Sequence, residues 1–137
     1  MAALTENVDR KEKEGKLLAH PVVASDIIYQ GAIVKHNAAG YLAPMAAEAG
    51  AAFAGIAYEK VDNSAGAAGD LTCRAEKYGA FLMNGTGFSQ ADVGSIAYAS
   101  DDNTISTTQG TNELAVGRIV EFISSTEVRV RIDNYAV

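Results

Sequence analysis

Short apolar segments separated by glycine and small polar residues constrain the fold of this chain more than any other feature. The clearest pair lies near the C-terminal end, where residues 115–123 and 127–132 flank a short Ser-Ser-Thr turn. In the second segment apolar residues alternate with arginines, which predicts an antiparallel strand with one buried and one solvated face. The apolar positions are Val128, Val130 and Ile132, and the alternate ones are Arg129 and Arg131.

Segments of the same kind recur along the chain, and turns rich in glycine, asparagine or aspartate separate them. The pair Asn84-Gly85 predicts a hairpin, because both residues tolerate positive φ, and residues 101–103 predict a tight turn. This spacing is typical of a mainly β protein, and we expect a small antiparallel β-barrel or sandwich-like domain. The other predicted strands lie at 26–29, 32–35, 41–44, 53–58, 71–78, 79–83, 95–100 and 104–108.

Helix signals are few. Residues 43–50 are rich in alanine, a good helix former, and Pro44 suits the first turn of a helix. A second short turn is predicted from Ser89 to Val93, with Ser89 as its N-cap. The fold is therefore expected to contain one or two short helices.

The N-terminal segment differs from the rest in its charge. Residues 1–16 contain four acidic and four basic residues and few apolar ones. Such a segment has no apolar stripe with which to pack, which predicts an extended arm that becomes ordered against a partner. We place this arm at residues 1–19 and the β-rich body at residues 20–137, because Pro21 is unsuited to a central strand.

The net charge of −6 resides entirely in the residues after position 16, which include thirteen acidic and seven basic side chains. This argues against sequence-independent binding of nucleic acid, which needs a basic surface. No run approaches the ~18 apolar residues of a membrane span, and the charged N-terminus is unlike a secretion signal. We therefore expect a cytoplasmic protein that binds neither nucleic acid nor membrane.

No constellation for catalysis, cofactor binding or metal binding is predicted. Cys73 is the only cysteine, and it shares the apolar face of its strand with Leu71 and Ala75, which indicates a core residue. The two histidines, His20 and His36, lack further ligands at metal spacing. A glycine-rich run at 85–90 lacks the third glycine of a dinucleotide fingerprint and is interpreted as a loop.

Arg118, Arg129 and Arg131 form the only basic cluster predicted in the body. Glu121 and Glu127 are close enough in sequence to pair with them across the predicted hairpin. Two interpretations stay open: a solvated sheet face, or a contact surface for an acidic partner or a neighbouring subunit.

Taken in order, these features resemble the capsid decoration, or cement, proteins of tailed bacteriophages. The resemblance extends over roughly residues 20–133 and lies in pattern and composition. It is carried by the charged arm together with residues 27–34, 51–57, 69–76, 115–121 and 128–132.

The resemblance implies a non-enzymatic homotrimer, made in the host cytoplasm, on the outer surface of the virion. There it would clamp adjacent copies of the major capsid protein and stabilise the expanded shell. The arm would contact the capsid, and the basic cluster would contact the neighbouring subunit. The capsid-contact candidates are Leu4, Val8, Arg10, Lys11, Leu17 and Leu18, and the subunit-contact candidates are Arg118, Arg129 and Arg131.

Two other classes of function remain as alternatives. A head-displayed β-barrel module could bind carbohydrate or a host surface as an adhesin, because six tyrosines are available for stacking on sugars. An enzyme is the third class, and it would depend on His20 or His36.

Overall fold

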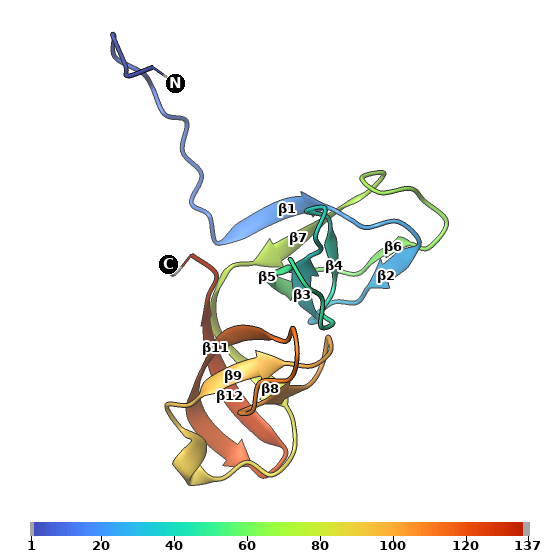
Figure 1. The fold of residues 1–137 in the computed structure, drawn as a ribbon, viewed down its shortest axis with the longest axis vertical. Coiled ribbons are helices and arrows are strands. Elements are labelled where there is room, and N and C mark those ends of the chain that lie inside the picture. Colours follow the sequence, from blue (N-terminus) through green and yellow to red (C-terminus); the bar gives the residue numbers. More distant parts are fainter. Residues whose placement is uncertain (1, 136–137) are drawn as a thin grey trace.

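The computed structural model describes residues 2–135, which form three antiparallel sheets (Figure 1). From edge to edge, the first sheet consists of β1 (Leu17–Pro21), β7 (Thr72–Glu76), β5 (Ala52–Ala57), β3 (Ile33–His36) and β4 (Leu42–Pro44). The second consists of β10 (Ile105–Ser106), β9 (Ile96–Ala99), β11 (Leu114–Ser124), β12 (Glu127–Asp133) and β8 (Tyr78–Asn84). The third is the pair β2 (Asp26–Ile28) and β6 (Val61–Asn63).

The chain passes from the first sheet to the second at Lys77. β7 ends at Glu76 and β8 begins at Tyr78, so a single residue joins the two strands. All strands of the first and third sheets precede Lys77, and all strands of the second sheet follow it. In Figure 1 the two five-stranded sheets accordingly form an upper and a lower part of the molecule.

Two clusters of buried side chains form the core. The first belongs to the N-terminal half and contains many small side chains, as expected for a chain without tryptophan. The second is built mainly from the second sheet, but it also includes Ile33 and Ile56 from the first sheet. Burial of these two isoleucines therefore holds the two sheets together. The first cluster consists of Val22, Ile28, Ala32, Val34, Leu42, Ala54, Ala57, Cys73 and Ala75.

The predicted C-terminal hairpin is confirmed. β11 and β12 pair in antiparallel fashion, and every second side chain of β12 from Val128 to Ile132 is fully buried. The predicted tight turn at residues 101–103 is also confirmed, because it joins the antiparallel strands β9 and β10. The Asp101 carboxylate stabilises it by accepting hydrogen bonds from the backbone N–H groups of Asn103 and Thr104, at 2.8 and 2.7 Å.

The predicted mainly β fold is confirmed, but the barrel, one of its two expected architectures, and one predicted hairpin are absent from the described residues. No sheet among residues 2–135 closes into a barrel, although Asn84 makes an isolated bridge to Thr104 beside β10. Asn84-Gly85 does not form a hairpin, because β8 pairs with β12, far along the chain. Gly85 is instead buried against Phe88 and the carbonyl of Ile105, where a Cβ would overlap both.

The predicted helix at residues 43–50 is absent. Its first two residues belong to β4, and Lys35 fixes the following loop. The Lys35 ammonium forms an ion pair with Glu48 at 2.7 Å and donates a hydrogen bond to the Ala46 carbonyl at 3.2 Å. These tertiary contacts override the local helix propensity of alanine. The described residues contain one helical turn, a 3₁₀ turn at Gln90–Asp92 within the second predicted helical segment.

Residues 2–16 form no helix or strand, and Figure 1 shows this segment leading away from the sheets. β1 begins at Leu17, so residues 17–19, which we had assigned to the arm, pair with β7 in the first sheet. We therefore use the name arm below for residues 2–16. Leu71 also departs from the prediction, because it lies before β7 and is 43% exposed.

Gly55 on β5 lies against the end of β7, next to the connection at Lys77, and it tests how closely these two strands approach each other. It has a φ of +117°, and a Cβ there would overlap the Glu76 carbonyl oxygen. We expect Gly55→Ala to lower the free energy of unfolding by roughly 3 kcal/mol or more, because strain and overlap add. The control is Gly40→Ala, which has a φ of +90° and open space around it, and which should cost only about 1 kcal/mol. Urea unfolding measures both, and equal losses would contradict this account.

Candidate functional site

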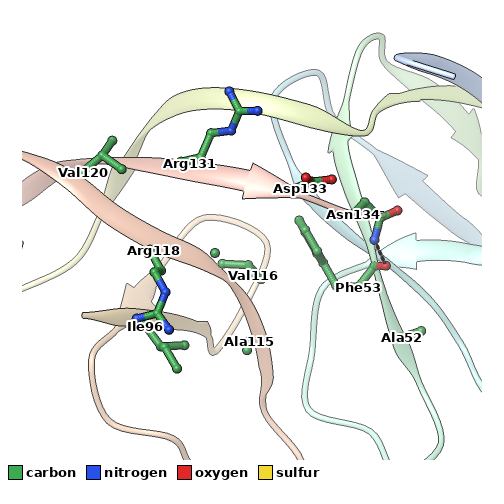
Figure 2. A pocket seen from close by; sticks show the side chains of 11 residues that line it. Ala52, Phe53, Ile96, Ala115, Val116, Arg118, Val120, Arg131, Asp133 and Asn134 are labelled. Carbon is green, nitrogen blue, oxygen red and sulfur yellow. Dashed lines mark hydrogen bonds between the residues drawn. The ribbon is translucent and has the colours of Figure 1, made fainter. Parts of the chain in front are cut away.

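An open groove of about 710 Å³ lies where β5 approaches β9, β11 and β12 (Figure 2). Its floor is mainly apolar, and charged and amide side chains stand at its rim. Such a combination of apolar surface with a few polar groups is typical of a binding site. The lining residues are Ala52, Phe53, Ile96, Ala115, Val116, Gly117, Arg118, Val120, Arg131, Asp133 and Asn134.

The groove exists because β11 extends beyond its pairing with β12. From Arg118 onward β11 pairs with β12, whereas residues 114–117 pair only with β9. A bulge between Ala115 and Gly117 bends the strand here. Gly117 allows the two strands to meet, because a Cβ at this position would overlap the carbonyl of Arg131. The side of residues 114–117 that faces away from β9 therefore borders the groove.

Two of the three predicted subunit-contact residues line this groove. Arg118 and Arg131 occupy directly paired positions on β11 and β12, and Figure 2 shows their side chains extending in opposite directions. Arg118 donates a hydrogen bond to the Gly94 carbonyl at 2.9 Å. Neither guanidinium forms an ion pair with any carboxylate of residues 2–135. The groove is thus lined by two cationic side chains and by one carboxylate, that of Asp133.

Arg129, the third candidate, does not line the groove. It forms an ion pair with Glu121 at 3.3 Å, across the hairpin as the sequence predicts. Within the described residues Glu127 makes no such pair. The basic cluster is thus divided between one arginine with a carboxylate partner and two arginines without one.

The capsid-contact candidates occupy two different settings. Leu4 and Val8 are 64% and 46% exposed in the arm. Arg10 and Lys11 are also exposed, and Lys11 lies 3.3 Å from the Asp9 carboxylate. Leu17 and Leu18 instead belong to β1, where they pair with Glu76 and Ala75. The arm therefore presents apolar side chains to solvent.

Backbone contacts hold the base of the arm against the body. The Tyr135 hydroxyl donates to the Gly15 carbonyl at 2.5 Å, and the Lys77 N–H donates to the Lys16 carbonyl at 2.8 Å. Asn134 then donates from its backbone to the Lys77 carbonyl and from its side chain to the Phe53 carbonyl, at 2.8 and 2.6 Å. Because Asn134 and Phe53 also line the groove, the arm base and the groove share one support.

The two histidines lie together, which their separation in sequence did not predict. The rings of His20 and His36 meet edge to face, with centroids 4.6 Å apart. The Nε2 atom of His20 is buried without a hydrogen-bond partner. Lys77 is only 2% exposed, and its ammonium donates to the Ala54 carbonyl at 2.7 Å. Three basic groups are thus gathered beneath the first sheet.

Burial weakens the basicity of all three groups. It lowers the pKa of His20 to about 4 and the pKa of Lys77 to about 8. Burial also lowers the pKa of His36, and the charge of Lys77 depresses the pKa values of both histidines further. These histidines are therefore neutral at neutral pH. Their contact arises from the tertiary fold and could not be read from their spacing in the sequence. His20 lies on β1 and His36 on β3, and β7 and β5 lie between these two strands in the first sheet.

Cys73 is fully buried in the first core cluster, as its strand pattern predicts. Burial, together with the nearby charge of Glu59, raises the pKa of its thiol to about 11. A thiol with so high a pKa is a poor nucleophile.

Nowhere in the described part of the chain do three or more His, Cys, Asp or Glu side chains gather as metal ligands would. Residues 2–135 also contain no helix with the length and apolar character of a membrane span.

The groove and the arm are the features that comparison with known proteins would have to explain. No protein-family model matches the chain, and neither the curated proteins nor the solved structures include a match.

The histidine pair predicts a loss of stability in mild acid. Between pH 6.5, the ordinary histidine pKa, and the folded pKa of His20 near 4, the unfolded chain binds protons that the folded chain excludes. The free energy of unfolding should therefore fall as the pH falls through this window. We expect a loss on the order of 1–2 kcal/mol between pH 7.5 and pH 5, measured by urea unfolding at each pH.

The matched control for this prediction is His20→Phe, which keeps an aromatic ring against His36 but takes up no proton. The range above pH 5 is chosen because the carboxylates, including Glu48 with its lowered pKa, stay ionised there. The variant should lose less stability than the natural chain over the same range. Identical pH profiles for the two proteins would contradict the assignment.

Proposed function

We propose that this chain is a non-enzymatic structural protein that decorates the outer surface of a bacteriophage head. In this role it forms a homotrimer, binds adjacent copies of the major capsid protein and stabilises the expanded shell. The observation that supports this best is the combination of an exposed arm with a broad, uncovered sheet face. Both are surfaces for binding other protein chains rather than sites for chemistry.

The arm supports the contact with the capsid. Its apolar side chains Leu4 and Val8 are exposed, and its acidic and basic residues are equal in number. A neutral segment of mixed charge suits a protein surface better than DNA, whose phosphates attract a basic one. An extended segment can also lie along a neighbour's sheet edge through its backbone hydrogen bonds. Arg10 and Lys11 then offer cationic contacts beside the apolar anchors.

The outward face of the second sheet supports contact between subunits. Ile96, Arg118 and Arg131 occupy one row of paired positions across β9, β11 and β12. The large apolar residues exposed around this row are Leu82, Ile96, Val120 and Ile123, which are 36–50% exposed. Exposed apolar surface that includes arginine is the composition of protein interfaces. A closed symmetric trimer would bury such surface and add stability to a body with a core of small residues.

The adhesin alternative gains less support from the structure. Tyr135 is 48% exposed, but its hydroxyl binds the Gly15 carbonyl. Tyr29 and Tyr58 are 55% and 45% exposed. One face of each ring already carries a cation, Lys60 at 5.3 Å and Arg74 at 4.9 Å from the respective centroids. These faces are therefore less available for stacking on a sugar.

Deletion of residues 2–14 tests the contact with the shell. Gly15 and Lys16 are retained, because their carbonyls accept the hydrogen bonds that hold the arm base. We expect the truncated protein to fold normally and to bind expanded phage heads at least about tenfold more weakly, since the arm anchors are lost. Cosedimentation with heads measures the affinity. A Gly/Ser segment of equal length serves as the control for arm length. Unchanged affinity would show that the body alone carries the contact.

Light scattering tests the assembly state. We expect a particle of three chains, each of 14.3 kDa, at micromolar concentration. A stable monomer at that concentration would contradict the decoration function as proposed.

A further inference from the structure

We propose that residues 4–8 of the arm bind in the groove of a second copy of this chain. In this contact the Glu6 carboxylate pairs with the Arg131 guanidinium, and Leu4 and Val8 cover the apolar part of the lining. The inference rests on the proposed self-assembly, for which it names the contact. It assigns Leu4 and Val8 to the neighbouring subunit in place of the shell, and it leaves Arg10 and Lys11 for the contact with the shell.

The groove contains cationic side chains that have no carboxylate partner among the described residues. Arg118 and Arg131 occupy paired positions, and no carboxylate of the described residues forms an ion pair with either. The chain nevertheless has seventeen acidic residues. Arg118 donates to the Gly94 carbonyl and its side chain points away from Arg131, so Arg131 is the group that a carboxylate can pair with through charge-assisted hydrogen bonds (Figure 2).

The groove also favours an extended segment over a compact ligand. Residues 114–117 of β11 pair with β9 on one side and have no paired residue on β12, although the Arg131 carbonyl lies against Gly117. The groove runs beside this unpaired side, and Phe53 and Val116 contribute apolar surface to it. An extended chain can therefore add backbone contacts along β11 while its side chains alternate between the groove and solvent.

The arm carries the matching pattern. In an extended chain the side chains at i, i+2 and i+4 share one face, so Leu4, Glu6 and Val8 point the same way. This face reads apolar, acidic, apolar, and it complements a groove with an apolar floor and two guanidiniums. The opposite face carries Thr5, Asn7 and Asp9. Leu4 and Val8 are largely exposed in the single chain, so they are available for this contact.

A second copy, rather than the same chain, supplies the segment. The arm base is fixed at Gly15 and Lys16 by hydrogen bonds to Tyr135 and Lys77. From there the arm leads away from the lower sheet, which contains β11 and β12 (Figure 1). The direction of the arm therefore carries its first residues away from the groove of its own chain (Figure 1).

The test compares charge reversals on the two faces of the arm, in the full-length protein and without shells. Glu6→Lys should weaken self-association at least about tenfold, since a charge-assisted contact becomes a repulsion. Asp9→Lys makes the same charge change on the opposite face and should leave association unchanged. Sedimentation equilibrium over a range of concentrations measures both. Equal effects of the two reversals would overturn the inference.

A reciprocal exchange of charge identifies the groove as the binding site. Arg131→Glu should also weaken association, and adding Glu6→Arg should restore it. Urea unfolding shows whether each variant remains folded, and Arg129→Glu, outside the groove, is the matched control. Failure of the exchange to restore association in folded protein would overturn the assignment.

Disulfide trapping distinguishes a second copy from the same chain. A chain with Glu6→Cys is mixed with a chain with Arg131→Cys, and the buried Cys73 contributes little background. We expect a linked product of two chains. If instead a chain with both substitutions forms only an internal link, the arm occupies its own groove and the inference is overturned.

The tests of the arm contact can fail independently of the test of the proposed function. If Glu6→Lys abolishes binding to phage heads but leaves self-association intact, the arm contacts the shell, the groove assignment fails and the decoration function stands. If the charge exchange governs self-association but no variant binds heads, the arm contact stands and the decoration function fails.

Discussion

Lys77 is the residue on which the rest of the structure depends, because it joins the two five-stranded sheets. Its N–H and carbonyl bind the base of the arm and the end of the C-terminal strand, and its ammonium binds the Ala54 carbonyl inside the first sheet. An ammonium buried in this way loses hydration, which lowers its pKa to about 8. Gly55 has no side chain where the chain must pass closest to this junction. Burial of the Lys77 ammonium thus costs some stability, and the same contacts fix the two sheets relative to each other.

This junction also determines what the surface can do. Asn134 binds the Lys77 carbonyl and the Phe53 carbonyl, so the end of β12 is held beside β5, and the groove forms between them. The same residue, Lys77, holds the arm base through the carbonyl of Lys16. The base of the arm and the groove therefore have fixed positions relative to each other in every copy. A protein built in this way can repeat one contact between neighbours, as a symmetric assembly or a lattice requires.

The sequence predicted the local elements well and the tertiary pairing poorly. The alternation from Val128 to Ile132 depends on strand periodicity alone, so it identified the buried face of β12 correctly. The helix expected at residues 43–50 failed because Lys35, distant in sequence, binds that loop through Glu48. Of the residues that line the groove, the sequence predicted only the arginines, as part of a basic cluster. Which of them lacks a carboxylate partner depends on the register of β11 against β12, and that register follows from bulges that no sequence pattern revealed.

The central claim is that a neighbour's arm covers residues 114–117 of β11 on the side that faces away from β9. Hydrogen–deuterium exchange of the amides at residues 114–117 tests it most directly, in the full-length protein and in the protein lacking residues 2–14. The account predicts slow exchange in the full-length protein at concentrations where it self-associates, and faster exchange after dilution or after loss of the arm. Equal exchange in both proteins at every concentration would contradict it.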